Sequence, residues 1–97
     1  MNIRFTDAEL RRRCNTAEAT EKTWGAAASD VRTSLCVLAA CSTASAYEGH
    51  PHVTSEGDKT VYKGRVADVI LDLSEDPGPP PEVVVEAIDI RAQRYEP

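Results

Sequence analysis

The spacing of apolar residues changes at Pro51, and this change constrains the fold more than any other feature of the chain. Before Pro51, apolar side chains recur every three or four residues, as they do along one face of a helix. After it they recur every second residue, as they do along one face of a strand. Helices and strands are therefore expected in separate parts of the chain, which predicts an α+β protein.

A strand and two helices are expected in the first part. Residues 2–5 alternate between polar and apolar side chains, which predicts a short strand. Thr6 and Glu9 have the spacing of a capping box, so we expect a helix that begins there and ends at Gly25. A second helix is expected to begin within residues 27–30. The turn between the two is short, which predicts an antiparallel helical hairpin.

The second part is expected to form most of the sheet. Its predicted strands are residues 53–56, 60–63, 66–73 and 82–92. Gly57-Asp58 is a turn pair typical of hairpins, and the prolines of residues 77–81 predict a loop. The predicted order is β-α-α-β-β-β, in which the two arms of the β-hairpin are counted as one strand. This order predicts a helical hairpin packed on a mainly antiparallel, four-stranded sheet.

The composition sets limits on the kind of protein. Ninety-seven residues are expected to form a single domain, 1–97, with one modest core. The three cysteines make no CxxC pair, so we expect reduced thiols in the cytoplasm, with Cys36 and Cys41 packed in the core. No signal peptide or membrane span is expected. The net charge of −5 comes from residues 50–97, which argues against nucleic-acid binding unless basic residues share one face.

Several short motifs occur in an order found in one known family. They are Ile3-Arg4-Phe5, Ala8-Glu9-Leu10-Arg11-Arg12, Trp24-Gly25, Leu38-Ala39-Ala40, Gly57-Asp58-Lys59, Val69-Ile70-Leu71 and Ile88-Asp89-Ile90. In this order the chain resembles the RelE/HigB-type killer proteins, the toxins of bacterial toxin–antitoxin pairs. The resemblance implies a ribonuclease-like fold, cleavage of messenger RNA on the ribosome without metal or cofactor, and silencing by an antitoxin protein.

The resemblance also implies a site of basic and polar side chains on the sheet and near the C-terminus. The residues expected to act in catalysis are Arg91, Arg94 and Tyr95, and those expected to hold the RNA phosphate are Lys63 and Arg65. The mechanism implied is attack of a ribose 2′-hydroxyl on the adjacent phosphate, with Tyr95 stacked on a base. The chain departs from the family at Asp68, where an arginine is expected, and it lacks a histidine near its C-terminus. A carboxylate at that point repels the phosphate.

Two functions from different classes remain open. The first is a toxin–antitoxin-type protein that cleaves messenger RNA, or a homologue with weakened or lost activity. The second is a non-catalytic protein-binding module on the same scaffold, which holds a partner with its helices or with a sheet face bearing Asp68, Asp72 and Asp89. In either case a monomer or a weak homodimer is expected, paired through an exposed sheet edge.

Three groups of residues have both a structural and a functional interpretation. His50 and His52 could ligate a metal ion, but a site needs further ligands, and an exposed loop is the expected setting. Arg11, Arg12 and Arg13 could contact phosphate or an acidic antitoxin segment, and a solvated helix face is the expected setting. Asp68, Asp72 and Asp89 could serve acid–base chemistry or hold Mg²⁺, and the solvated face of a sheet is the expected setting.

Overall fold

Helices and strands occupy separate parts of the chain, as the change in apolar spacing predicts. The computed structural model describes residues 1–92. In chain order the elements are β1 (Asn2–Phe5), α1 (Ala8–Cys14), α2 (Ala17–Trp24), the 3₁₀ turn η1 (Gly25–Ala27), α3 (Ala28–Ala40), α4 (Ala44–Glu48), β2 (Val53–Glu56), β3 (Lys59–Lys63), β4 (Ala67–Asp76) and β5 (Glu82–Ala92). The α+β class, the N-terminal strand and the hairpin after Pro51 are confirmed.

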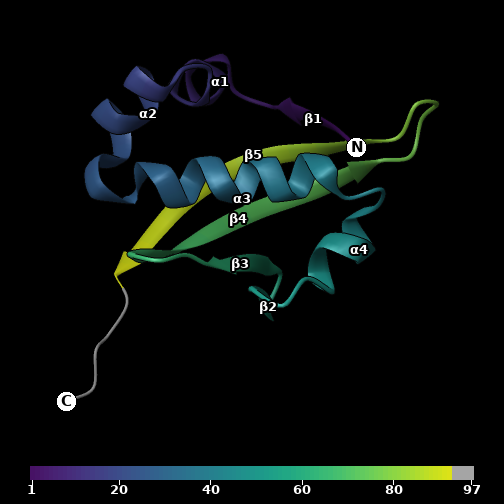
Figure 1. Cartoon of the computed structure of the whole chain (residues 1–97). Coiled ribbons are helices and arrows are strands. Elements are labelled where there is room, and N and C mark those ends of the chain that lie inside the picture. Colours follow the sequence, from purple (N-terminus) through teal and green to yellow (C-terminus); the bar gives the residue numbers. More distant parts are fainter. Residues whose placement is uncertain (93–97) are drawn as a thin grey trace.

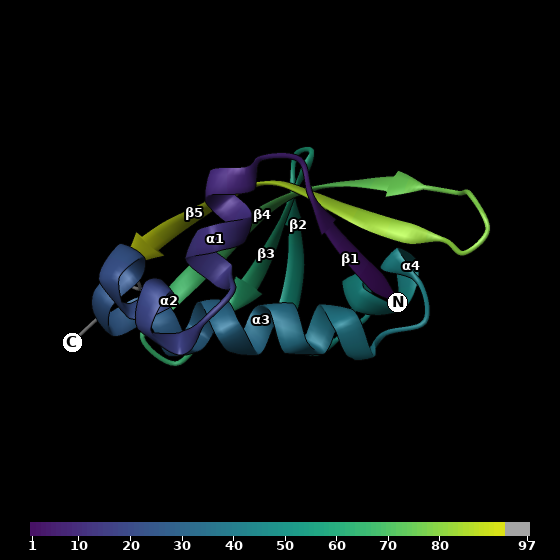
Figure 2. The same ribbon diagram turned by 90° about the horizontal axis from the view of Figure 1, so that it is seen from above.

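The strands form one mixed sheet of five strands in the order β1-β5-β4-β3-β2. Strand β1 runs parallel to β5, and the other neighbours are antiparallel. The four-stranded count was wrong because both arms of the hairpin, β2 and β3, are separate strands of the sheet. The helices lie on one side of this sheet, with α3 along it, and in the part of the chain described no helix lies on the opposite face (Figure 1, Figure 2).

The core lies between α3 and the sheet. Its fully buried aliphatic side chains are Val31, Leu38, Val69, Leu71, Val83 and Val85. Burying each of them stabilises the fold by about 1.5–3 kcal/mol relative to exposure, so the aliphatic residues account for most of the stabilisation. Ile3 and Phe5 are partly buried against the same cluster, as the alternation in residues 2–5 predicts.

The single helix predicted before Gly25 is two helices. Asp7, and not Thr6, caps α1, because its carboxylate accepts the N–H of Glu9 at 2.8 Å. Helix α1 ends at Cys14, and the hydroxyl of Thr16 starts α2 by accepting the N–H of Ala19 at 3.0 Å. A residue that caps a new helix has extended φ and ψ angles, and this interrupts the helical path.

A buried carboxylate joins α3 to the turn between β3 and β4. Asp30 is only 3% exposed, and its two oxygens accept the backbone N–H groups of Arg65, Val66 and Ala67 at 2.8, 2.9 and 3.0 Å. Gly64 lies directly beside it: a Cβ atom at Gly64 would lie 2.3 Å from Cγ of Asp30. The bonds satisfy three donors that would otherwise be orphaned, and they fix this turn against the helix.

Two further expectations need correction, one about Cys36 and one about the end of β4, and the fold contains one additional short helix, α4. Cys36 is exposed on α3 and is not a core residue, because the helix turns it away from the sheet, whereas Cys41 is partly buried. The connection after α3 contains a helix, α4, capped by the hydroxyl of Thr43. Strand β4 continues to Asp76, since its last residues pair with the start of β5. In residues 1–92 no helix is both long and apolar enough to cross a membrane.

Candidate functional site

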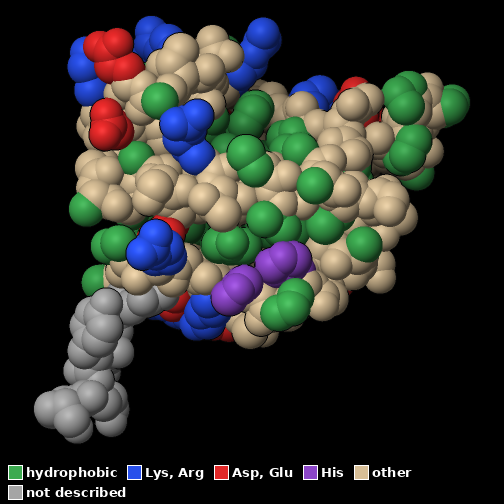
Figure 3. All heavy atoms as spheres, viewed as in Figure 1, with side chains coloured by type: hydrophobic (Ala, Val, Ile, Leu, Met, Phe, Trp, Pro, Cys, Tyr) green, Lys and Arg blue, Asp and Glu red, His purple; other side chains and the backbone are tan. Residues whose placement is uncertain are grey.

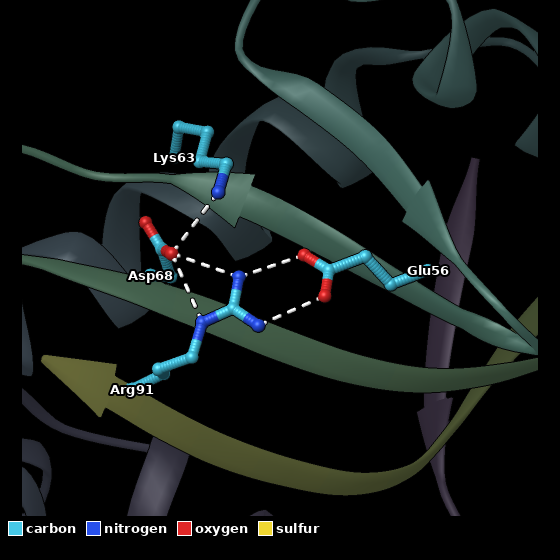
Figure 4. Close-up of polar contacts among 4 residues, drawn as sticks. All are labelled: Glu56, Lys63, Asp68 and Arg91. Atoms are coloured by element: carbon cyan, nitrogen blue, oxygen red, sulfur yellow. Dashed lines mark hydrogen bonds and ion pairs between the residues drawn. The ribbon is translucent and has the colours of Figure 1, made fainter. Parts of the chain in front are cut away.

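Four charged side chains form a network on the sheet face opposite α3, which we call the uncovered face (Figure 4). The Arg91 network consists of Glu56, Lys63, Asp68 and Arg91. Nη1 and Nη2 of Arg91 donate to both carboxylate oxygens of Glu56 at 2.8 and 2.7 Å. Its Nε and Nη2 donate to Oδ2 of Asp68 at 3.2 and 3.0 Å, and Nζ of Lys63 donates to the same oxygen at 3.1 Å.

The strand register brings three of these residues together. Lys63 on β3 lies opposite Asp68 on β4, and Asp68 lies opposite Arg91 on β5. Residues directly opposite on neighbouring strands have Cβ atoms about 4.5–5.5 Å apart, close enough for their charged groups to meet. Glu56 belongs to β2, which is separated from β5 by two strands. Its contact with Arg91 therefore requires the sheet to bend toward the uncovered face.

The network leaves Arg91 with no open edge for a phosphate. Nε, Nη1 and Nη2 all donate to carboxylate oxygens, and those bonds occupy the two edges of the guanidinium that bind phosphate in bidentate fashion. The hydrogen bonds to Glu56 and then to Asp68 raise the pKa of Arg91, and the bond from Arg91 lowers the pKa of Glu56. Both groups are therefore held in their charged forms.

Asp68 differs from the solvated carboxylate that its position in the sequence predicts. Its side chain is only 8% exposed, whereas those of Lys63 and Arg91 are each 42% exposed. The two cations lie over the carboxylate and cover it. A buried carboxylate is stable only when it is paired and hydrogen-bonded, so Asp68 is a structural centre of this face.

The rest of the uncovered face is also paired. Lys59 donates to Asp72 at 2.8 Å, and this bond raises the pKa of Lys59. By strand alternation the face carries six acidic and four basic side chains: Glu56, Asp68, Asp72, Asp76, Glu82 and Asp89, with Arg4, Lys59, Lys63 and Arg91. Among them, in residues 1–92, only Asp89 makes no ion pair. The face is therefore nearly neutralised, with a small acidic excess.

The structure brings together only part of the predicted site. Arg91 and Lys63 meet at Asp68, but Arg65 lies in the turn before β4, where its backbone N–H bonds Asp30. Arg94 and Tyr95 lie outside the described residues. Of the basic run on α1, Arg12 and Arg13 pair with Glu9. Arg11 instead lines a hollow of about 450 Å³ beside β1.

A second region of polar side chains lies on the side of the sheet that faces α3. A cavity of about 420 Å³, which we call the His52 cavity, is lined by Ser29, Asp30, Thr33, His52, Tyr62, Lys63, Gly64 and Arg65. His50 and His52 appear side by side at the surface in Figure 3. Within residues 1–92 no group of three or more histidine, cysteine, aspartate or glutamate side chains is placed to hold a metal ion.

Sequence reasoning missed Glu56 and Tyr62. Glu56 precedes the hairpin turn, and the alternation of side chains along β2 places it on the uncovered face. Only the bend of the sheet brings it to Arg91. The strand alternation places Tyr62 on the core face, and its ring centroid lies 6.2 Å from those of His50 and His52.

No family model matches the chain, and neither a curated protein nor a solved structure is significantly similar to it.

Proposed function

We propose that this chain is a toxin–antitoxin-type protein of the RelE/HigB kind that no longer cleaves RNA on its sheet face and acts by binding a partner protein. The observation that carries the proposal is the Arg91 network (Figure 4). Arg91 and Lys63 are two of the basic residues that the family resemblance assigns to RNA. Both are paired with Asp68, and Arg91 is also paired with Glu56.

The pairing argues against phosphate chemistry at this point. Cleavage of an RNA phosphodiester needs positive groups placed where negative charge develops on the phosphate. A phosphate approaching Arg91 must displace one carboxylate that is bound through two parallel hydrogen bonds and another that is nearly buried. The displaced carboxylates would then lie beside the phosphate and repel it. Substrate and transition state are both disfavoured by this arrangement.

The surplus charge of the same face favours a protein partner with a basic contact surface. Six carboxylates face four cations there, and Asp89 is exposed and makes no ion pair in residues 1–92. Complementary charge speeds association and fixes orientation, although rim charges contribute little to affinity. The family resemblance implies that such a partner is an antitoxin encoded beside the gene.

Induced expression in a bacterial host tests the loss of RNA cleavage. We expect growth to continue and messenger RNA to stay intact, because Arg91 and Lys63 are neutralised. The matched variant is Glu56→Gln with Asp68→Asn, which frees both cations; it should bind single-stranded RNA more tightly than the unaltered protein does. Growth arrest by the unaltered protein, relieved by Arg91→Ala or by Arg94→Ala together with Tyr95→Phe, would contradict the proposal.

Co-purification with the product of the neighbouring gene tests the binding role. Asp89→Lys reverses a charge of the uncovered face that makes no ion pair within residues 1–92, and it should weaken the complex, mainly by slowing association. Glu48→Lys makes the same change on α4, away from that face, and should leave the complex unchanged. Equal effects of the two variants, or no complex at all, would count against a partner on this face.

A further inference from the structure

The His52 cavity combines a cation, Arg65, with aromatic rings. Arg65 lies on its wall, and in residues 1–92 the guanidinium of Arg65 makes no hydrogen bond or ion pair. Glu56, Asp68 and Arg91 do not line this cavity, and Lys63 is the one residue that it shares with the Arg91 network. At about 420 Å³ its volume lies in the range of about 300–1,000 Å³ found for small-molecule sites.

Two aromatic rings, His52 and Tyr62, line the cavity, and a third, His50, lies next to them. The ring centroids of His50 and His52 are 5.6 Å apart, and each is 6.2 Å from that of Tyr62. These separations are those of interacting aromatic pairs, about 4.5–7 Å. Tyr62 is buried and His52 is exposed, so the cluster has a fixed inner ring and an accessible outer ring. An accessible ring on a fixed support provides a surface on which a flat ligand can stack.

The polar groups around the rings favour an anion. Arg65 supplies positive charge, and Ser29 and Thr33 supply hydroxyls. The ammonium of Lys63, which also lines the cavity, is bound to Asp68. Among residues 1–92, Asp30 is the only carboxylate on the wall. Its oxygens already accept three backbone N–H groups, and it is 3% exposed, so it presents little free negative charge to the cavity. A phosphate group can accept hydrogen bonds from a guanidinium fork and from hydroxyls at once.

We propose that the His52 cavity binds a small phosphate-bearing molecule with a planar ring, of the size of a nucleoside monophosphate. Arg65 holds the phosphate, with Ser29 beside it, and the ring stacks on His52. This site goes beyond the proposed partner binding and does not depend on it, because neither Arg91 nor Asp89 takes part. The protein therefore carries a ligand site on the helix-covered side and a paired, acidic face on the other.

Calorimetric titration of the whole chain with adenosine monophosphate tests the site. Arg65→Ala should weaken binding at least about tenfold, because a charge-assisted bond is lost. Arg32→Ala removes an equal charge from α3 outside the cavity and should have no effect. His52→Ala should weaken binding of the nucleotide but not that of inorganic phosphate, and His52→Phe, which restores a ring, should recover it. Thermal unfolding of each variant checks that it is folded.

Several results would overturn the assignment. The absence of any saturable binding would do so, as would equal losses in Arg65→Ala and Arg32→Ala, which would indicate attraction to the overall charge. Inorganic phosphate binding as tightly as the nucleotide would remove the role of the ring. A single-stranded oligoribonucleotide that binds more than ten times as tightly as the mononucleotide would indicate a groove for a nucleic-acid strand. None of these results depends on whether the partner complex forms.

Discussion

At the scale of single residues, Asp68 decides how the uncovered face behaves. It lies between two cations and is nearly buried, so its charge is compensated only while both remain in place. Removing its charge would leave Lys63 and Arg91 facing each other without a common partner. Like charges at this distance repel, and the hydrogen bonds to a charged acceptor are lost.

The variant Asp68→Asn should therefore lower the free energy of unfolding by about 2 kcal/mol. Asp89→Asn makes the same chemical change on the same face at an exposed residue that makes no ion pair in the described part of the chain. It should change the free energy of unfolding by less than about 0.5 kcal/mol. Urea-induced unfolding at neutral pH measures both. Equal effects of the two variants would mean that the network contributes nothing beyond a surface charge.

The bond between Arg91 and Glu56 predicts a pH dependence. A carboxylate whose pKa is lower in the folded state than in the unfolded state stabilises the fold above its unfolded pKa, and this contribution is lost as the pH falls. The bond from Arg91 lowers the pKa of Glu56 below its ordinary value of 4.5. The stability difference between the unaltered protein and Glu56→Gln should thus be largest near pH 7 and shrink progressively below about pH 4.5.

Urea unfolding at a series of pH values measures this difference. Glu48→Gln removes an exposed carboxylate that makes no ion pair in the described residues, and it serves as the matched control. A difference for Glu56→Gln that stays constant from neutral to acidic pH would show that its ionised carboxylate does not bind Arg91 in solution.

At the scale of elements, the turn between β3 and β4 is held by its contact with α3. Gly64 has no room for a side chain, since a Cβ atom there would lie 2.3 Å from Cγ of Asp30 and 2.5 Å from the carbonyl oxygen of Ala67. Neither neighbour can move freely, because Asp30 also accepts the N–H of Ala67. The Gly64→Ala variant should therefore separate the turn from the helix.

We expect Gly64→Ala to lower the free energy of unfolding by about 3 kcal/mol, through overpacking and the loss of bonds to Asp30. Gly49→Ala is the control, because its nearest neighbouring atom would lie at 3.6 Å; it should stay within about 0.5 kcal/mol of the unaltered protein. Thermal and urea unfolding of both variants provide the comparison. A Gly64→Ala protein as stable as Gly49→Ala would show that the turn has room to relax.

The elements were predictable where the signal is local. Alternation and the Gly57-Asp58 turn fix β2 and β3 within a few residues, and Gly25 ends a helix because its φ of +56° suits glycine. The break between α1 and α2 also has a local signal, since Thr16 is a good capping residue. The apolar spacing on both sides of the break is helical, however, and this spacing predicts one continuous helix.

At the scale of the whole molecule, the candidate site depends on register and on the bend of the sheet. Lys63, Asp68 and Arg91 are spaced along their strands so that strand pairing can place them together. The sequence alone does not state which strands are neighbours, nor how far the sheet bends. Glu56 reaches Arg91 across two intervening strands only because of that bend, and no local pattern could have predicted it.

A scaffold does not determine an activity, because function depends on the side chains that the scaffold carries. The uncovered face has basic residues at the positions that the toxin resemblance assigns to RNA, but each is matched by a carboxylate. The function of this face therefore depends on the paired state of Arg91. It separates a face that binds RNA from a face that is closed to phosphate.

Nuclear magnetic resonance of the Arg91 side chain tests whether Glu56 and Asp68 bind its guanidinium in solution. If Glu56 and Asp68 hold the guanidinium, its Nε–H and Nη–H protons should give distinct, slowly exchanging signals that do not move when single-stranded RNA is added. Asp68→Asn should weaken this protection, and Asp89→Asn should not. Signals that are averaged by rapid exchange in the free protein, and that shift saturably as RNA is added, would contradict the account.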